Sequence, residues 1–151
     1  MAMTMNGEYE LAVPPQTVWE KLNDAATLKA CIPGCEQLDK TSDTEFQAVA
    51  TVKIGPVKAK FKGRVTLSDL DPPNGYKISG QGDGGVAGFA KGGATVKLAP
   101  KNGGTLLSYN VDAQIGGKLA QLGQRLVNGA AKNVADDFFA NFANAVNPKA
   151  A

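Results

Sequence analysis

Residues 57–67 read Val-Lys-Ala-Lys-Phe-Lys-Gly-Arg-Val-Thr-Leu, and this stretch decides the fold class. Its positions alternate between two kinds of side chain, as expected for a strand with one buried and one solvent-facing side. The apolar set is Val57, Ala59, Phe61, Val65 and Leu67, and the polar set is Lys58, Lys60, Lys62, Arg64 and Thr66. The same period of two extends from Cys35 to about Ile115, with turn sequences such as Gly55-Pro56 between the segments. Because short turns join antiparallel neighbours, we predict an antiparallel meander with one apolar face.

The segments on either side of this meander predict the elements that pack on its apolar face. Residues 8–13 alternate like a strand, and two short helical segments follow at 16–22 and 25–31. Downstream of Gly117, apolar residues recur every three or four positions as far as Val146, the spacing of an amphipathic helix. This stripe contains Leu119, Leu122, Leu126, Ala130, Val134, Phe138 and Phe142. We predict an α+β fold in which one continuous C-terminal helix covers a curved sheet.

Composition favours one globular domain and removes several classes of chemistry. The chain has 151 residues, 43% hydrophobic and 20% charged, which suits a single domain over residues 1–151. Histidine is absent, so the commonest zinc ligand and the histidine-dependent triads are excluded, and we expect no metal site. The formal net charge is +2, with no signal-peptide pattern and no apolar run of ~18 residues. We therefore expect a soluble, cytoplasmic protein that does not bind nucleic acid.

Glycines cluster between residues 80 and 93, where Gly80-Gln-Gly-Asp-Gly-Gly85 matches the G-x-G-x-x-G pattern of dinucleotide-binding loops. That pattern requires a helix to begin at its last glycine, and residues 86–93 are too rich in glycine to form one. Glycine within strands instead permits bulges, sharp bends and close backbone approach. It also removes bulk from a sheet face, so a ligand cavity stays open as a second interpretation.

Few side chains offer reactive chemistry. Cys31 and Cys35 flank Ile-Pro-Gly, and we interpret them as two small thiols of a loop, with a redox pair as the alternative. Asp83 and Tyr109 are the candidates for general acid–base chemistry. No catalytic residue is assigned from the sequence.

A basic stripe, defined as Lys53, Lys58, Lys60, Lys62 and Arg64, is the strongest charge feature. Lysines on a solvated sheet face discourage edge-to-edge aggregation, which is the simplest interpretation. The alternative is a docking surface for an anionic membrane or an acidic protein partner.

A strongly curved sheet that grips a single helix leaves space between the two, and the apolar faces predict what lines it. We expect a cavity suited to an apolar small molecule. The candidate ligand-binding residues are Ile54, Phe61, Val65, Phe89, Tyr109, Leu122, Leu126 and Phe138.

Several motifs resemble one known family over nearly the whole chain. They are Val18-Trp-x-x-Leu22-x-Asp24, Leu28-x-x-Cys-Ile-Pro-Gly-Cys35-Glu36, Gly82-Asp-Gly-Gly-Val-Ala-Gly88, Thr105-x-Leu-x-Tyr109 and Gly116-Gly-Lys-Leu-Ala-Gln-Leu-Gly-Gln-Arg-Leu126. In this order they resemble the carbon monoxide dehydrogenase CoxG family, within the START, or birch-pollen-allergen-like, superfamily. The resemblance implies a helix-grip fold: a curved seven-stranded antiparallel sheet around a long C-terminal helix, with two short helices after the first strand.

The same resemblance implies a function. It is that of a non-catalytic accessory protein of a molybdenum hydroxylase of the carbon monoxide dehydrogenase type. Such a protein would bind a quinone or lipid, without a covalently bound cofactor, and aid enzyme assembly or recruitment to the inner face of the membrane. The alternative is a polyketide cyclase/dehydrase-type enzyme acting on a hydrophobic carbonyl substrate. Whether the chain forms a homodimer stays open.

Overall fold

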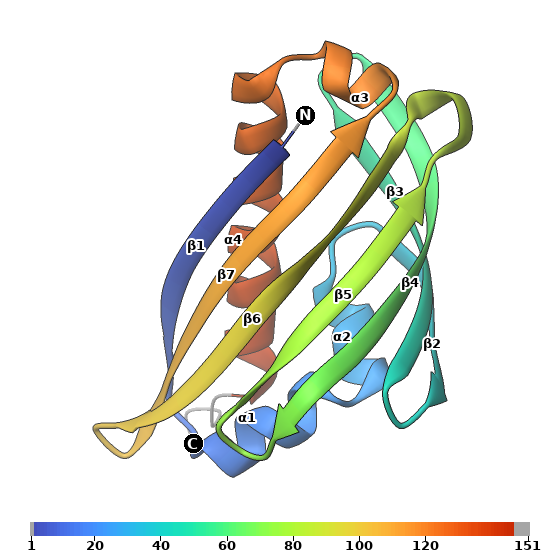
Figure 1. Cartoon of the computed structure of the whole chain (residues 1–151). Coiled ribbons are helices and arrows are strands. Elements are labelled where there is room, and N and C mark those ends of the chain that lie inside the picture. Colours follow the sequence, from blue (N-terminus) through green and yellow to red (C-terminus); the bar gives the residue numbers. More distant parts are fainter. Residues whose placement is uncertain (1, 147–151) are drawn as a thin grey trace.

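The computed structural model describes residues 2–146, in which a sheet curves around a long C-terminal helix (Figure 1). The strands are β1 (Ala2–Leu11), β2 (Cys35–Ser42), β3 (Glu45–Ile54), β4 (Val57–Asp71), β5 (Gly75–Asp83), β6 (Phe89–Lys101) and β7 (Gly104–Gly116). The helices are α1 (Pro15–Leu22), α2 (Ala25–Cys31), the 3-10 turn η1 (Gly85–Ala87), α3 (Lys118–Gln121) and α4 (Gln124–Val146). The seven strands are antiparallel in the order β1-β7-β6-β5-β4-β3-β2, which confirms the α+β helix-grip fold.

Two predicted boundaries are wrong. The first strand begins at Ala2 and not at residue 8, because Met3 and Met5 continue its apolar face. The predicted continuous C-terminal helix is broken between α3 and α4. Gly123 lies at the break with a φ of +92°, a conformation that glycine adopts without strain.

The glycine-rich segment forms two paired strands and the short turn between them. β5 ends at Asp83, and η1 spans only three residues before β6 begins at Phe89. Since no helix follows Gly85 that could hold a phosphate at its N-terminus, the dinucleotide interpretation is excluded.

The buried side chains form two clusters at opposite ends of the space between sheet and helix. The larger cluster lies toward α1 and α2, where Val18, Leu107 and Phe142 have no exposed surface. The smaller cluster lies toward α3 and includes Ile115 and Leu119. The region between these clusters is where the sheet and α4 can leave room for a ligand.

Candidate ligand-binding site

The inner face of the sheet is incompletely covered between the two clusters. Phe61 and Val65 of β4, Ile78 of β5 and Val111 of β7 point inward but remain half-buried. On the helix side, Phe138 is half-buried as well. Side chains on the concave face can be exposed only toward the interior or its openings, so their remaining accessible surface indicates unfilled space beside apolar groups.

A band of glycines on the same face enlarges this space. Gly63 pairs with Gly82, and Gly80 pairs with Gly92, across three neighbouring strands. At Gly82 a side chain would begin 3.9 Å from Phe61, an ordinary van der Waals distance. The structure therefore has room at this point of the inner face, as the cavity interpretation of the glycine cluster predicted.

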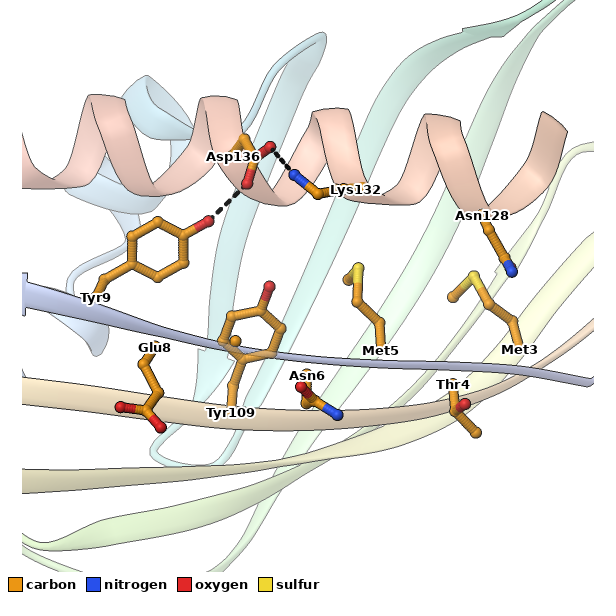
Figure 2. Close-up of a pocket in the computed structure, with 11 residues that line it drawn as sticks. Met3, Thr4, Met5, Asn6, Glu8, Tyr9, Tyr109, Asn128, Lys132 and Asp136 are labelled. Atoms are coloured by element: carbon orange, nitrogen blue, oxygen red, sulfur yellow. Dashed lines mark hydrogen bonds and ion pairs between the residues drawn. The ribbon is translucent and has the colours of Figure 1, made fainter. Parts of the chain in front are cut away.

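A hollow of about 420 Å³ opens between the edge strand β1 and α4 (Figure 2). Its lining is Met3, Thr4, Met5, Asn6, Gly7, Glu8, Tyr9, Tyr109, Asn128, Lys132 and Asp136. The methionines and Tyr9 point toward the helix, whereas the side chains of Thr4, Asn6 and Glu8 point away from it. The volume lies within the range of roughly 300–1,000 Å³ that small-molecule sites occupy. Since Tyr109 belongs to the inner face of β7, the hollow opens beside the interior.

A short chain of polar contacts joins β1 to α4 at one end of this hollow (Figure 2). The Tyr9 hydroxyl donates to Asp136 Oδ1 at 2.7 Å, and Lys132 Nζ donates to Asp136 Oδ2 at 2.8 Å. We call these three residues the β1–α4 clasp. It is the polar connection between the first and last elements on this side of the fold.

Electrostatics fix the protonation states of the clasp. The hydrogen bond from Lys132, followed by that from Tyr9, holds the pKa of Asp136 below its usual value, so the carboxylate is ionised at neutral pH. Burial and the adjacent carboxylate raise the pKa of Tyr9. Burial, then the charge of Asp136, raises the pKa of Tyr109. Both phenols are therefore protonated donors, and none of these groups is shifted toward the neutral pKa that suits a general base.

An aromatic stack lies beneath the clasp and supports it. The ring of Phe139 stacks on Tyr9 with centroids 4.2 Å apart and on Tyr109 with centroids 5.3 Å apart. Opposite Tyr109, position 7 of β1 is a glycine, where a side chain would begin only 2.8 Å from the Tyr109 hydroxyl. Gly7 thus lets the Tyr109 ring lean across the edge strand toward the hollow.

The structure brings most of the predicted ligand-binding residues to the interior. Ile54, Phe61 and Leu122 pack around the smaller cluster, whereas Val65 and Phe138 pack around the larger one. Tyr109 is buried in the larger cluster.

Two predicted residues lie elsewhere. Phe89 is 44% exposed and faces outward, because its neighbour Ala90 occupies the inner position of β6, so its placement in the cavity was wrong. Leu126 is 40% exposed and lies at the rim, against Gly55 in the β3–β4 turn.

Asp83 cannot act in the interior, which corrects its candidacy as an acid–base group. It is exposed at the end of β5, in register with Lys62 and Phe89 on the outer face. Its Oδ1 accepts a hydrogen bond of 2.8 Å from the main-chain N–H of Gly85. The carboxylate therefore shapes the turn before η1.

The two cysteines are free thiols, Cys31 buried and Cys35 half-buried. Burial raises the pKa of both, which disfavours the reactive thiolate and supports the interpretation as small loop thiols. Within residues 2–146, no group of three or more Cys, Asp or Glu side chains is arranged to hold a metal ion. No helix in the described part of the chain combines the length and apolarity needed to cross a membrane.

Sequence reasoning missed the side of the hollow formed by β1 and α4. Met3 and Met5 share the parity of Tyr9, so following the alternation further toward the N-terminus would have found them. The pairing of Tyr9 with Asp136 joins residues 127 positions apart and has no local signal.

Comparison with known proteins gives one family and many similar folds. A model of the CoxG family, described as a subunit of carbon monoxide dehydrogenase, matches residues 7–147. A crystal structure of a conserved protein from Geobacillus kaustophilus is 34% identical, covers 95% of each chain and has a TM-score of 0.89. No protein with a curated description matches.

More distant solved structures share the fold alone. A START superfamily protein from Mycobacterium smegmatis is 13% identical, with a TM-score of 0.72 over 95% of this chain and 96% of that one. A Streptomyces aromatase/cyclase is 12% identical, with a TM-score of 0.70 over 97% of this chain and 94% of that one.

Proposed function

The chain belongs to the CoxG family of carbon monoxide dehydrogenase, and on this basis we propose that it binds an apolar ligand between the inner face of the sheet and α4. The observation that carries the proposal is the half-buried apolar surface between the two core clusters. A protein interior is normally close-packed, so apolar groups left accessible in the middle of a domain need an occupant.

The ligand class follows from the lining. Apolar side chains such as Phe61 and Val65 and the glycine band suit a hydrocarbon or ring system. At the side opening, the Lys132 ammonium and the protonated Tyr109 hydroxyl can donate to a polar head. A quinone or a lipid fits this combination, and we propose that ligand class.

We further propose that the protein is a non-catalytic accessory to a molybdenum hydroxylase, which it assists in assembly or in recruitment to the membrane. The family membership supports this role. The pKa shifts support binding over catalysis, because those of the interior phenols move upward and that of Asp136 moves downward, away from neutrality.

A cyclase-type activity has less support. Folds of this kind include an aromatase/cyclase, which motivates the comparison. Of the two acid–base candidates only Tyr109 reaches the interior, and burial keeps it protonated. A proton-abstracting group for a carbonyl substrate is therefore lacking among the described inner-face residues named above.

Native mass spectrometry with a panel of menaquinones and fatty acids tests the binding proposal. We expect a one-to-one complex with at least one class and a rise in Tm at saturating ligand. Decylamine serves as the matched control, because its cationic head faces the donors Lys132 and Tyr109. Absence of both a complex and a shift across the panel would refute the proposal.

A further inference from the structure

We propose that the outer face of the sheet carries a docking groove for an acidic, extended segment of another protein. The groove has a volume of about 900 Å³ and crosses from β2 to β6, on the side of the sheet away from α4. Three cationic side chains, those of Lys62, Arg64 and Lys91, line it together with the exposed ring of Phe89. This surface is separate from the ligand site, so the proposal does not depend on the proposed function.

Strand register arranges the groove in two neighbouring cross-strand rows. One row contains Gln47, Arg64, Gln81 and Lys91, and the next contains Val49, Lys62, Asp83 and Phe89. Adjacent strands lie about 4.8 Å apart, so the backbones of Arg64 and Lys91, two strands apart, are separated by about 10 Å. A carboxylate lying over the intervening Gln81 can approach both cations.

Charge on this face is far from balanced although the formal net charge of the chain is only +2. The outward cations of β3 to β6 are Lys53, Lys58, Lys60, Lys62, Arg64, Lys77, Lys91 and Lys97. Ion pairs engage Lys60 with Glu36 at 3.1 Å, Arg64 with Glu45 at 3.3 Å and Lys77 with Asp69 at 3.3 Å. The other five have no ion-pair partner among residues 2–146, which leaves a surplus of positive charge for a partner.

One feature of the face costs the fold stability. Lys53 and Lys58 are directly opposite each other in the β3–β4 ladder, and like charges at such positions are destabilising. Asp83, the acid nearest Lys62, already accepts the N–H of Gly85. The cations are therefore not arranged to satisfy one another within the chain, as expected of a surface whose counter-charge comes from outside.

Phe89 gives the groove an apolar anchor point. Its ring is 44% exposed and lies in the same row as Val49, with Lys91 two residues further along β6. Binding energy in protein interfaces concentrates at aromatic and arginine side chains that a partner desolvates. A segment with carboxylates on either side of an apolar residue complements this arrangement.

The shape favours a protein segment over a lipid surface. The sheet bends around α4, so its outer face is convex (Figure 1). A planar bilayer would contact the most protruding residues, whereas the cations and Phe89 line a recess. An extended chain can follow the recess across the strands.

Fluorescence anisotropy with the labelled peptide Glu-Glu-Leu-Glu-Phe-Glu-Glu tests the proposal on the full chain. We expect binding that weakens about ten-fold when NaCl is raised from about 0.05 M to about 0.3 M. The groove variant Lys62→Glu/Lys91→Glu should weaken binding at least about ten-fold, and Phe89→Ala several-fold. The matched control Lys77→Glu/Lys97→Glu makes the same charge change on the same face outside the groove and should alter binding less than about three-fold. Unchanged Tm values establish that the variants are folded.

Each other result overturns the groove. Equal weakening by both double variants would mean diffuse electrostatic attraction. Absence of binding at low salt, or equal binding of the peptide Lys-Lys-Leu-Lys-Phe-Lys-Lys, would remove the acidic partner. Tight binding to phosphatidylglycerol vesicles that survives Lys62→Glu/Lys91→Glu, without peptide binding, would assign the cations to a membrane instead.

Discussion

Filling the interior from the sheet side should abolish ligand binding while leaving the protein folded. Gly82 lies on the inner face of β5, and the first carbon of a side chain there would meet only Phe61, at 3.9 Å. Gly82→Leu would place an isobutyl group in the space that we assign to the ligand. Gly82→Ala should give a smaller effect in the same direction.

The magnitude follows from the same contacts. Replacing a strand glycine reduces the entropy of the unfolded chain, and each buried CH₂ group contributes about 0.8 kcal/mol. We expect Gly82→Leu to raise the free energy of unfolding by about 1 kcal/mol, or Tm by about 2–4 °C. The added group occupies ligand volume, so Kd for the best ligand of the panel should rise at least about ten-fold.

Displacement of the dye 1-anilinonaphthalene-8-sulfonate measures this affinity, and thermal unfolding reports stability in the same samples. Gly129→Ala is the matched control, since Gly129 is exposed on α4 with no atoms near a side chain at that position. A Gly82→Leu protein that is folded and binds with wild-type affinity would refute the interior site. If Gly82→Leu fails to fold, Gly82→Ala decides the question.

Four stability experiments examine the framework around the site. Phe142→Ala removes a side chain with no exposed surface and should cost about 3–5 kcal/mol in urea unfolding; less than about 1 kcal/mol would contradict the packing. Gly129→Ala should stabilise α4 by about 0.5–1 kcal/mol, whereas Gly123→Ala should destabilise because of its φ of +92°, and equal effects would contradict the break. Tyr9→Phe deletes the hydrogen bond to Asp136 and should cost about 0.5–1.5 kcal/mol, with no loss expected if the clasp is absent in solution. Because the folded pKa of Asp136 is lowered, its stabilising effect is present at neutral pH and lost as pH falls through that pKa; the stability difference between wild type and Asp136→Asn should shrink between about pH 7 and pH 3, and a constant difference would contradict the assignment.

The fold was predictable because its signals are local and repeated. The alternation of residues 57–67 gives β4 and its inner face directly, and the turn at Gly55-Pro56 gives the antiparallel partner β3. The helical stripe gives α4, but not its start. Gly123 fits the helical period as a tolerated residue, and only its left-handed φ shows that it separates two helices.

The candidate site was less predictable because it depends on contacts between the ends of the chain. Tyr9 and Asp136 each have an ordinary local role, on a strand face and on a helix. They become neighbours only because β1 pairs with β7 at the edge of the sheet and α4 returns beside that edge. Neither hydrophobic period nor residue spacing encodes this return.

The parity of a strand residue determines its face, but not how deeply it is buried. Phe89 illustrates the first limit: the interruption at η1 resets the alternation, so its face could not be counted from β5. Phe61 and Leu67 illustrate the second, since both point inward from β4, yet Leu67 is buried in a cluster and Phe61 remains half-buried beside Gly82. Depth depends on how far the sheet bends away from α4, and that distance is set jointly by strands distant in sequence. A ligand site formed by incomplete contact between sheet and helix is therefore a property of the curvature, and the glycine band is the part of it that the sequence displays.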